Sequence, residues 1–221
     1  PCVFVRLTAC NLRCSYCDTA YAFTSGEKKT LKEIQNRIEE LAKPFCTSAD
    51  EQKLPLIELT GGEPLLQKNV LKLMTSLCAD GYTVLLETSG AHDISSVDSR
   101  VHRIMDLKCP SSGECDRNLM SNLQHLRTSD EIKFVLGSIE DYEWMKQQIA
   151  ECNLAGRCPL LVSWVHPLSP DQQDSSLKPF PEGHTPIARE DLVNRIVADA
   201  LPVRFQVQMH KVIWPPELRG V

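Results

Sequence analysis

Near its start the chain reads Val3-Phe-Val-Arg-Leu7-Thr-Ala-Cys10-Asn-Leu-Arg-Cys14-Ser-Tyr-Cys17. Apolar residues alternate in 3–7, which is typical of a half-buried strand, and three cysteines follow in the loop after it. Three thiolates can bind three irons of a [4Fe–4S] cluster and leave the fourth iron without a protein ligand, so a small molecule can bind there. This stretch therefore predicts a strand and a loop that hold a cluster used for chemistry.

Zinc is the alternative metal that these cysteines could bind. Structural zinc sites use four ligands, and their pairs of Cys or His are usually separated by a longer loop. Cys2 or Cys46 could supply a fourth thiolate. The tight spacing of the three cysteines favours the iron–sulfur cluster.

Length and composition favour one enzyme-sized domain. The chain has 221 residues, of which 42% are hydrophobic, and this suffices for one substantial core, whereas two domains would each be small. We therefore interpret residues 1–221 as a single domain. The net charge is −5, and the basic residues are scattered among acidic ones, so nucleic acid is not an expected partner.

We interpret the cysteines as free thiols of a protein in a reducing compartment. Ten cysteines could indicate secreted disulfides, but we find neither a charged and apolar leader nor an apolar run of about 18 residues. We expect a cytoplasmic protein without a membrane segment. Cys78, Cys152 and Cys158 are interpreted as small buried apolar residues.

Predicted strands alternate with predicted helices along the chain. Strands are expected at 3–7, 55–60, 82–87, 101–107, 131–136, 160–165 and 202–209. Helices are expected at 30–43, 67–79, 141–151 and 190–200. The segments 110–129 and 169–186 are rich in Ser, Pro, Gly and Asp and are weak helix candidates. This alternation predicts a parallel sheet with right-handed crossovers.

The predicted fold class is α/β, an open partial (βα)6-type barrel in which some crossover helices are reduced or lost. A closed barrel of eight units would be cramped in 221 residues. The carboxyl ends of parallel strands share one rim, so the polar residues that follow the strands are expected to meet there. These residues are Cys10 to Thr19, Thr60 to Pro64, Glu87 to Gly90, Lys108, His166 and His210.

The turn Gly61-Gly62-Glu63-Pro64 follows the second predicted strand. Its glycines offer bare backbone that a ligand can approach closely, and the Glu63 carboxylate could accept hydrogen bonds from an ammonium group. The alternative is a tight turn whose glycines only permit the geometry and whose Pro64 starts a helix. The cysteine loop favours the ligand-binding interpretation.

The cysteine loop and the Gly-Gly-Glu-Pro turn resemble those of the radical S-adenosylmethionine superfamily, whose members share a partial βα barrel. Within it, five stretches in order resemble the 7-carboxy-7-deazaguanine synthase family of the queuosine and deazapurine pathway. The stretches are Phe4 to Thr19, Thr60 to Pro64, Leu86 to Gly90, Asp106 to Gly113 and Gln208 to Lys211. The family normally begins with a Gln-Gly-Glu-Gly type segment, so we expect residues upstream of Pro1.

The resemblance implies a lyase reaction on 6-carboxy-5,6,7,8-tetrahydropterin. A 5′-deoxyadenosyl radical made from S-adenosylmethionine abstracts hydrogen from C6 of the pterin. Ring contraction with loss of ammonia then gives 7-carboxy-7-deazaguanine, and S-adenosylmethionine is regenerated. In such enzymes the cofactor supplies the difficult chemistry and the protein supplies orientation.

The resemblance also implies roles for individual residues. Cys10, Cys14 and Cys17 match the cluster ligands, and thiolates suit iron. Thr19 matches the residue that binds Mg²⁺ through its hydroxyl, with the pterin carboxylate completing the site; a hydroxyl that caps a nearby helix is the alternative. The implied contacts to S-adenosylmethionine are Tyr16, Cys17, Asp18, Gly62, Glu63, Lys108 and His166.

Four residues match the substrate-binding positions of the family. Arg6 can bind a carboxylate through its guanidinium group, although an ordinary surface ion pair is the alternative. Glu87 could accept N–H groups of the pterin ring, and Thr60 could bond to its polar edge. His210 matches a substrate-binding histidine, for which the alternative is a purely structural role.

The expected partners are a small pterin and an electron donor such as a flavodoxin or a ferredoxin, and a homodimer is the expected assembly. Two other functions are weighed. The first is a radical S-adenosylmethionine activase that acts on a protein, against which the Gln208-Met-His210-Lys211 stretch argues. The second is a non-catalytic iron–sulfur or zinc module, which would not bind S-adenosylmethionine. The conjunction of motifs favours the pterin lyase.

Overall fold

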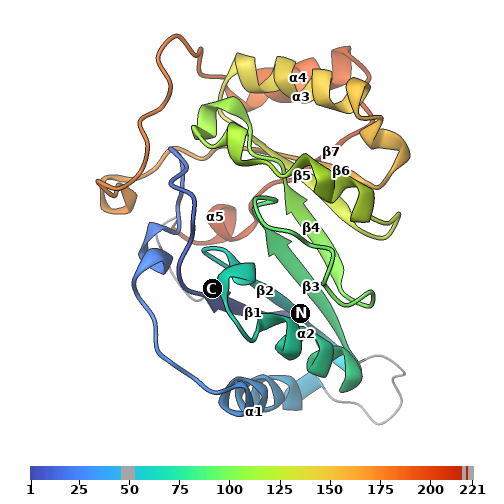
Figure 1. Cartoon of the computed structure of the whole chain (residues 1–221). Coiled ribbons are helices and arrows are strands. Elements are labelled where there is room, and N and C mark those ends of the chain that lie inside the picture. The colour runs from blue at the N-terminus through green and yellow to red at the C-terminus, as the bar shows by residue number, and fades with distance from the viewer. Residues whose placement is uncertain (46–52, 216–217, 219–221) are drawn as a thin grey trace.

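The protein is described here by a computed structural model that covers residues 1–45, 53–215 and 218. Seven strands form one sheet in the order of the chain, and every neighbouring pair is parallel. The strands are β1 (Cys2–Leu7), β2 (Lys53–Gly61), β3 (Tyr82–Thr88), β4 (His102–Asp106), β5 (Glu131–Leu136), β6 (Leu160–Trp164) and β7 (Arg204–Phe205). Among the described residues β1 and β7 do not pair with each other, so the sheet is an open partial barrel, as predicted (Figure 1).

The four longer α-helices cover the two ends of the sheet, the short last helix lies between them, and shorter segments cover the rest of the middle (Figure 1). The helices are α1 (Leu31–Ala42), α2 (Val70–Ala79), α3 (Ile139–Glu151), α4 (Arg189–Ala198) and α5 (His210–Ile213). In the described part of the chain, β3 connects to β4 and β4 to β5 without an α-helix. The predicted loss of some crossover helices is therefore confirmed.

Short 3₁₀ turns replace or extend the helices. After β4 they are η4 (Pro110–Ser112), η5 (Cys115–Arg117) and η6 (Met120–His125). Elsewhere they are η1 (Ala20–Phe23), η2 (Lys43–Phe45), η3 (Pro64–Leu66), η7 (Leu154–Gly156) and η8 (Pro170–Gln172). The helix expected at 67–79 begins only at Val70, because η3 and a turn come first.

The last strand is much shorter than expected. The apolar alternation at 202–209 predicts a full strand, but only Arg204–Phe205 pairs with β6. Pro202 has no N–H to donate, and after Gln206, whose N–H bonds to the Val162 carbonyl at 2.7 Å, the chain turns into α5. The prediction of a strand over 202–209 is therefore wrong at both ends.

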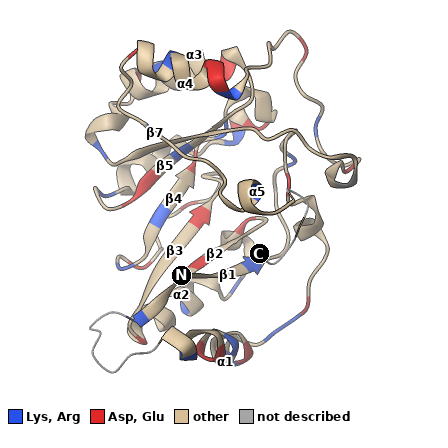
Figure 2. Cartoon of the chain, turned by 180° about the vertical axis from the view of Figure 1, so that it is seen from behind, with Lys and Arg blue, Asp and Glu red and all other residues tan. Residues whose placement is uncertain are grey.

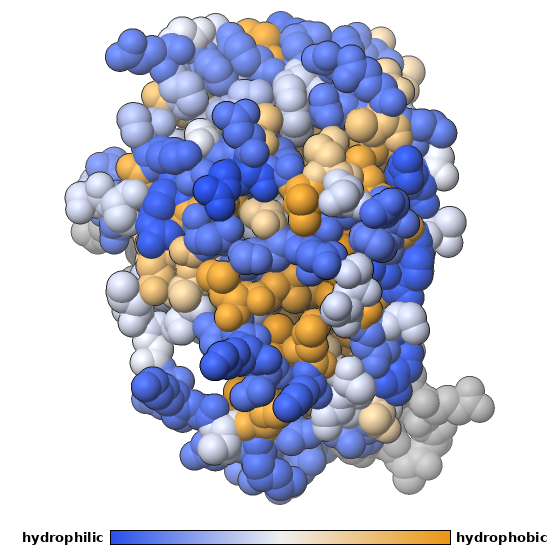
Figure 3. Space-filling model, in the orientation of Figure 1, coloured by the Kyte–Doolittle hydropathy of each residue, from blue (hydrophilic) through white to orange (hydrophobic). Residues whose placement is uncertain are grey.

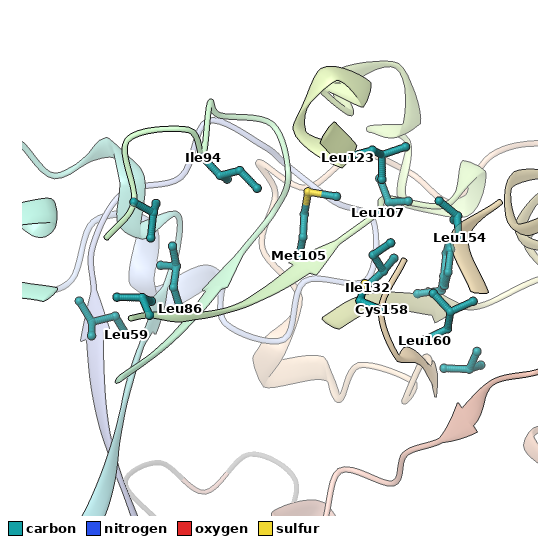
Figure 4. Packing of buried hydrophobic residues seen from close by; sticks show 14 of the residues in the cluster. Leu59, Leu86, Ile94, Met105, Leu107, Leu123, Ile132, Leu154, Cys158 and Leu160 are labelled. Atoms are coloured by element: carbon teal, nitrogen blue, oxygen red, sulfur yellow. The ribbon is translucent and has the colours of Figure 1, made fainter. Parts of the chain in front are cut away.

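One face of the sheet forms the hydrophobic core. Leu59, Leu86, Met105, Ile132 and Phe134 lie on successive strands β2 to β5 and are fully buried. Over the middle of the sheet, where long helices are missing, Ile94 and Leu123 approach Met105 from the two flanking segments (Figure 4). The surface over this region carries apolar side chains across its middle (Figure 3).

The opposite side of the sheet, called the inner face below, is polar. Because side chains alternate along a strand, the residues between the core positions point to this side. The polar and charged ones among them include Arg6, Glu58, Thr60, Glu87, Asp106 and Lys133. Arg6 stands opposite Thr60 in the β1–β2 register, and Asp106 stands opposite Lys133 in the β4–β5 register. Charged groups near the ends of β1 and β3 are visible in Figure 2.

The burial of Met105 gives a test of this core. We expect Met105→Ala to lower the free energy of unfolding by about 2–5 kcal/mol, because it leaves a cavity in the middle of the sheet. Met120→Ala is the matched control, since Met120 is 37% exposed in a neighbouring segment and should cost less than about 1 kcal/mol. Urea denaturation measures both values, and equal losses in the two variants would contradict this account of the core.

Candidate active site

The three cysteines of the loop after β1 are free thiols at different depths. Cys14 is buried, whereas Cys10 and Cys17 are half-buried. The loop turns on itself, because the Cys17 N–H donates to the Cys14 carbonyl at 3.1 Å and the Leu12 N–H donates to the Cys10 sulfur at 3.4 Å. All three thiols therefore belong to one compact loop.

The Gly61-Gly62-Glu63 turn holds the start of this loop through its backbone. The Gly62 N–H donates to the Leu7 carbonyl at 2.9 Å, and the Glu63 N–H donates to the Ala9 carbonyl at 2.8 Å. A Cβ at Gly62 would lie 2.1 Å from the Ala9 carbonyl oxygen, which is closer than such atoms can approach. Only glycine permits this contact, so the β1–β2 pairing continues beyond the strand ends into the cysteine loop.

The other side of the loop is held by the segment after β4. The Ser15 N–H donates to the Ser112 carbonyl at 3.0 Å, and the Ser15 hydroxyl donates to the Ser111 carbonyl at 2.5 Å. The Arg13 N–H donates to the buried Glu114 carboxylate at 2.7 Å. A segment that is only a weak helix candidate in the sequence therefore anchors the loop with the three cysteines.

Asp141, at the start of α3, in turn fixes that segment. Its buried carboxylate accepts hydrogen bonds from the Ser111 N–H at 2.7 Å and the Gly137 N–H at 2.7 Å, and also from the Ser111 hydroxyl. Ser138 and Asp141 also form a capping box that begins α3. The Ser-x-x-Asp pattern before an apolar run is the sequence signal that could have revealed this anchor.

The raised pKa values of the thiols favour the binding of a positively charged group. Burial raises the pKa of the Cys14 thiol to about 11, while the Lys108 ammonium opposes this shift. Burial also raises the pKa of Cys10, and the charge of Cys17 adds to the effect. The thiols are close enough that each ionised one makes ionisation of the others less favourable. A bound cationic cluster would offset both the cost of burying the thiolates and their mutual repulsion.

Lys108 pairs with Asp106 next to the thiols. The two charged atoms are 2.6 Å apart, and both side chains are about nine-tenths buried. Burial would lower the pKa of Lys108, but Asp106, Cys14 and Cys17 together raise it above its usual value. The second Asp106 oxygen is buried without a hydrogen-bond partner among the described residues, as is the Asn11 amide oxygen. These unpaired acceptors fit a site that takes a ligand carrying N–H or O–H groups.

The part of the chain that the structure describes contains no preformed set of ligands for a single metal ion. No three His, Cys, Asp or Glu side chains in residues 1–45, 53–215 and 218 are grouped to bind one ion. A cubane cluster makes a different demand, because each thiolate binds its own iron and the sulfurs need not converge on one point. The residues present therefore suit the cluster better than zinc; Cys46, one suggested fourth ligand, lies outside the described residues.

Glu63 has a different set of partners from the one expected. Its carboxylate is fully buried and accepts hydrogen bonds from the Leu65 N–H at 3.0 Å, the Thr88 hydroxyl at 2.9 Å and the Ser89 N–H at 2.8 Å. The Ser89 hydroxyl also donates to it, at 2.6 Å. The Glu63 side chain thus connects the turn after β2 to the end of β3. The expected contact of Glu63 with S-adenosylmethionine stays a prediction, and the carboxylate, which already has protein partners, does not support it.

Asp18 and Thr19 lie where the cysteine loop meets α5. Asp18 forms an ion pair with Lys211, which brings the carboxyl-terminal helix against the loop. The Thr19 hydroxyl lies 3.7 Å from the Cys17 sulfur. Thr19 precedes η1, but its side chain makes no capping hydrogen bond there, so the alternative role of helix cap is not supported.

The inner face brings together the predicted substrate residues of neighbouring strands. The Thr60 hydroxyl donates to Glu87 at 2.9 Å, and the Lys133 ammonium lies 2.6 Å from the other Glu87 oxygen. The Lys133 charge lowers the pKa of Glu87 to about 2.

Arg6 forms no ion pair within the described residues, so the alternative of an ordinary surface ion pair is not supported. Lys133 was missed, because one lysine in a strand has no distinguishing sequence signal.

His210, Tyr16 and His166 are less closely tied to this set. His210 stands at the start of α5, where burial first and then the charge of Lys211 lower its pKa, with Arg6 and Lys133 adding to the effect. The Tyr16 hydroxyl donates to the Val135 carbonyl at 3.4 Å. Within the described part of the chain, His166 forms one hydrogen bond, with the neighbouring Pro167 carbonyl at 3.0 Å, and packs edge-on against Trp164.

Comparison with known proteins decides the family. The model of the radical S-adenosylmethionine superfamily matches residues 5–155. The 7-carboxy-7-deazaguanine synthase of Koribacter versatilis is 39% identical over 222 residues, which cover 100% of this chain and 92% of that protein. The chain belongs to the 7-carboxy-7-deazaguanine synthase family. The synthase of Chlorobaculum tepidum is 38% identical over 224 residues, covering 100% of this chain and 89% of that protein.

Solved structures share the fold of this synthase family member. QueE from Escherichia coli has a TM-score of 0.61 and 18% identity, covering 94% of this chain and 86% of that one. SuiB from Streptococcus suis, bound to its precursor peptide SuiA, has a TM-score of 0.63 and 13% identity, covering 96% and 50%. At these identities the likeness concerns the fold alone.

Family membership makes the protein a radical S-adenosylmethionine lyase of the deazaguanine synthase type, with a [4Fe–4S] cluster and S-adenosylmethionine as cofactors. The cysteine loop is the part of this chain that fits such a cluster. The helices of the described residues include none that is both long enough and apolar enough to cross a membrane.

The buried contacts of Glu63 give a prediction that separates structure from ligand binding. We expect Glu63→Gln to lower the free energy of unfolding of the free chain by about 1–3 kcal/mol, because an amide nitrogen would face hydrogen-bond donors. Glu182→Gln, on an exposed loop, is the control and should change it by less than about 0.5 kcal/mol. Equal stability of the Glu63→Gln variant and the unmodified protein would mean that the carboxylate serves only a ligand.

Proposed function

We propose that this enzyme converts 6-carboxy-5,6,7,8-tetrahydropterin to 7-carboxy-7-deazaguanine and ammonia. The observation that carries the proposal is the set of recognition groups on three adjacent strands. Arg6 on β1 stands opposite Thr60 on β2, and Thr60 donates to Glu87 on β3. This row offers a cation for the carboxylate of the pterin and an anion for its N–H groups, on the side of the sheet beneath the cysteine loop.

Each group has a defined task in this proposal. The Arg6 guanidinium, which has no ion-pair partner among the described residues, binds the pterin carboxylate. Glu87 is held as an anion by Lys133 and accepts N–H groups of the pyrimidine ring. Thr60 orients Glu87, and His210 on α5 contacts the substrate from the carboxyl-terminal side of the site. The inner face is thereby assigned to the pterin.

The cofactors take the neighbouring positions. Cys10, Cys14 and Cys17 would bind the cluster, which together with S-adenosylmethionine supplies the 5′-deoxyadenosyl radical. Contacts to S-adenosylmethionine are assigned to a set of residues around the loop and the turn. They are Tyr16, Cys17, Asp18, Gly62, Glu63, Lys108 and His166. For Glu63 we assign the contact to its backbone, because its carboxylate already has protein partners.

Mg²⁺ is also part of the proposal. The Thr19 hydroxyl makes no capping bond and lies beside the Cys17 sulfur, so it can face a metal ion between cluster and substrate. One hydroxyl is a weak ligand, but Mg²⁺ keeps several waters and accepts anionic ligands from its substrate. The pterin carboxylate would complete the site and be fixed between Mg²⁺ and Arg6.

The net reaction exchanges no electrons with the medium, because the pterin loses only ammonia and S-adenosylmethionine is re-formed. An electron donor such as a flavodoxin or a ferredoxin is needed only to start the radical reaction. We place the enzyme in the cytoplasm, since the thiols must stay reduced to bind iron, and we propose a homodimer as its assembly.

The test is the reaction itself. Anaerobically reconstituted enzyme is incubated with S-adenosylmethionine, Mg²⁺, a reductant and 6-carboxytetrahydropterin, and the products are separated by mass spectrometry. We expect the deazaguanine product and ammonia in equal amounts, with S-adenosylmethionine largely unconsumed. The matched controls are Cys14→Ala, which should lose iron and turnover, and Cys152→Ala on the far side of the sheet, which should keep both. Stoichiometric loss of S-adenosylmethionine without a deazaguanine product would contradict the proposal.

A further inference from the structure

Lys133 reaches across the inner face to a carboxylate two strands away. Its ammonium on β5 lies 2.6 Å from a Glu87 oxygen on β3, and β4 runs between them. Both side chains are largely shielded from solvent, with 16% and 29% of their surface exposed. A lysine that spans a strand to meet one carboxylate is a specific contact, because exposed lysines usually remain in water.

A second carboxylate stands beside this pair without such a partner. Glu58 on β2 forms no ion pair among the described residues, although Glu87 is close enough to affect its titration. Burial and then the charge of Glu87 raise the pKa of Glu58 to about 7, while Lys133 and Arg6 oppose the shift. Two neighbouring carboxyl groups are therefore present, and only one of them is bonded to the lysine.

Among the charged groups of the inner face, Lys133 has the largest effect on the ionisation of Glu87. The charged groups that act on Glu58 or Glu87 are Arg6 on β1, Lys108 after β4 and Lys133 on β5. The Cys2 thiol on β1 lies 4.0 Å from a Glu58 oxygen. Asp106 on β4 and His210 on α5 lie near Lys133 instead. Lys108 is bonded to Asp106 at 2.6 Å, which offsets much of its charge. Lys133 is the largest influence on the pKa of Glu87, and Lys108 only a minor one.

We propose that Lys133 is a positioning residue that selects Glu87, and not its neighbour Glu58, as the ionised carboxylate of the inner face. Lys133 and Thr60 hold one Glu87 oxygen each, which fixes the plane of the carboxylate. Each oxygen keeps lone pairs for a ligand. The site therefore takes a ligand whose flat edge presents two adjacent N–H groups, as a 2-aminopyrimidinone does.

The identity of that ligand as a pterin rests on the proposed function, but the role of Lys133 does not. In Lys133→Met the two carboxyl groups would compete without a cation bonded to either one. One proton would then be shared between them near neutral pH, as happens when carboxylates adjoin. A ligand that needs ionised Glu87 would therefore bind less well as the pH falls, whereas in the unmodified enzyme its binding is independent of Glu87 titration above about pH 4.

The first experiment needs no ligand. The full chain with its cluster is labelled with carbon-13 at the glutamate carboxyl groups, and the Glu87 signal is identified by its absence in Glu87→Gln. We expect no Glu87 titration above pH 4 in the unmodified protein or in Lys133→Arg, and a midpoint near pH 7 in Lys133→Met. In Lys133→Met with Glu58→Gln, the midpoint should fall by about one pH unit, because the competing charge is gone.

The second experiment measures the KM for 6-carboxytetrahydropterin at pH 6 and pH 8.5. In Lys133→Met we expect KM to rise about tenfold at pH 6 and to recover towards the unmodified value at pH 8.5, since one pH unit of titration corresponds to tenfold in ionisation. A merely structural defect would raise KM equally at both pH values and would not be rescued by Lys133→Arg.

The outcomes separate the two proposals. An unshifted Glu87 midpoint in Lys133→Met, or equal midpoints in Lys133→Met and Lys133→Arg, would overturn the role of Lys133. If Glu87 titrates as expected but the unmodified enzyme neither binds nor converts the pterin, the role of Lys133 stands and the proposed function fails.

Discussion

The site depends on two backbone hydrogen bonds, from Gly62 to Leu7 and from Glu63 to Ala9. They extend the parallel pairing of β1 and β2 past the ends of the strands, so the cysteine loop is positioned by the sheet itself. The bare Cα of Gly62 allows this approach. Glu63 then carries the same connection to β3 through its buried carboxylate. A chain of local contacts thus links the thiols to the strands that hold the substrate residues.

The inner face combines buried charges in a way that serves binding more than stability. Lys108 with Asp106 and Lys133 with Glu87 are largely shielded ion pairs, and the desolvation of such pairs usually offsets much of their attraction. Their arrangement leaves Arg6 without an ion-pair partner in the described residues and keeps Glu87 ionised. The sheet therefore presents separated positive and negative groups that a small zwitterionic or carboxylated ligand can satisfy.

Much of the fold follows from local sequence, and the site follows only in part. Short apolar stretches predicted β1 to β6, and the Thr30-x-x-Glu33 capping box explains where α1 begins. The convergence of strand ends placed Thr60 beside Glu87. The buried role of Glu63 and the span from Lys133 could not be predicted, because both depend on contacts between strands distant in sequence. The short β7 depends on Pro202 and on where α5 packs.

The measurement that tests the central claim most directly is iron content after reconstitution of Gly62→Ala, with unfolding by urea as its companion. Gly156→Ala is the control, since its added Cβ would meet only a flexible side chain, at 3.1 Å. If backbone docking positions the cysteine loop, Gly62→Ala loses most of its iron and is less stable, because the added methyl group forces Ala9 away. Gly156→Ala keeps its iron. Full iron loading and unchanged stability in Gly62→Ala would contradict the account.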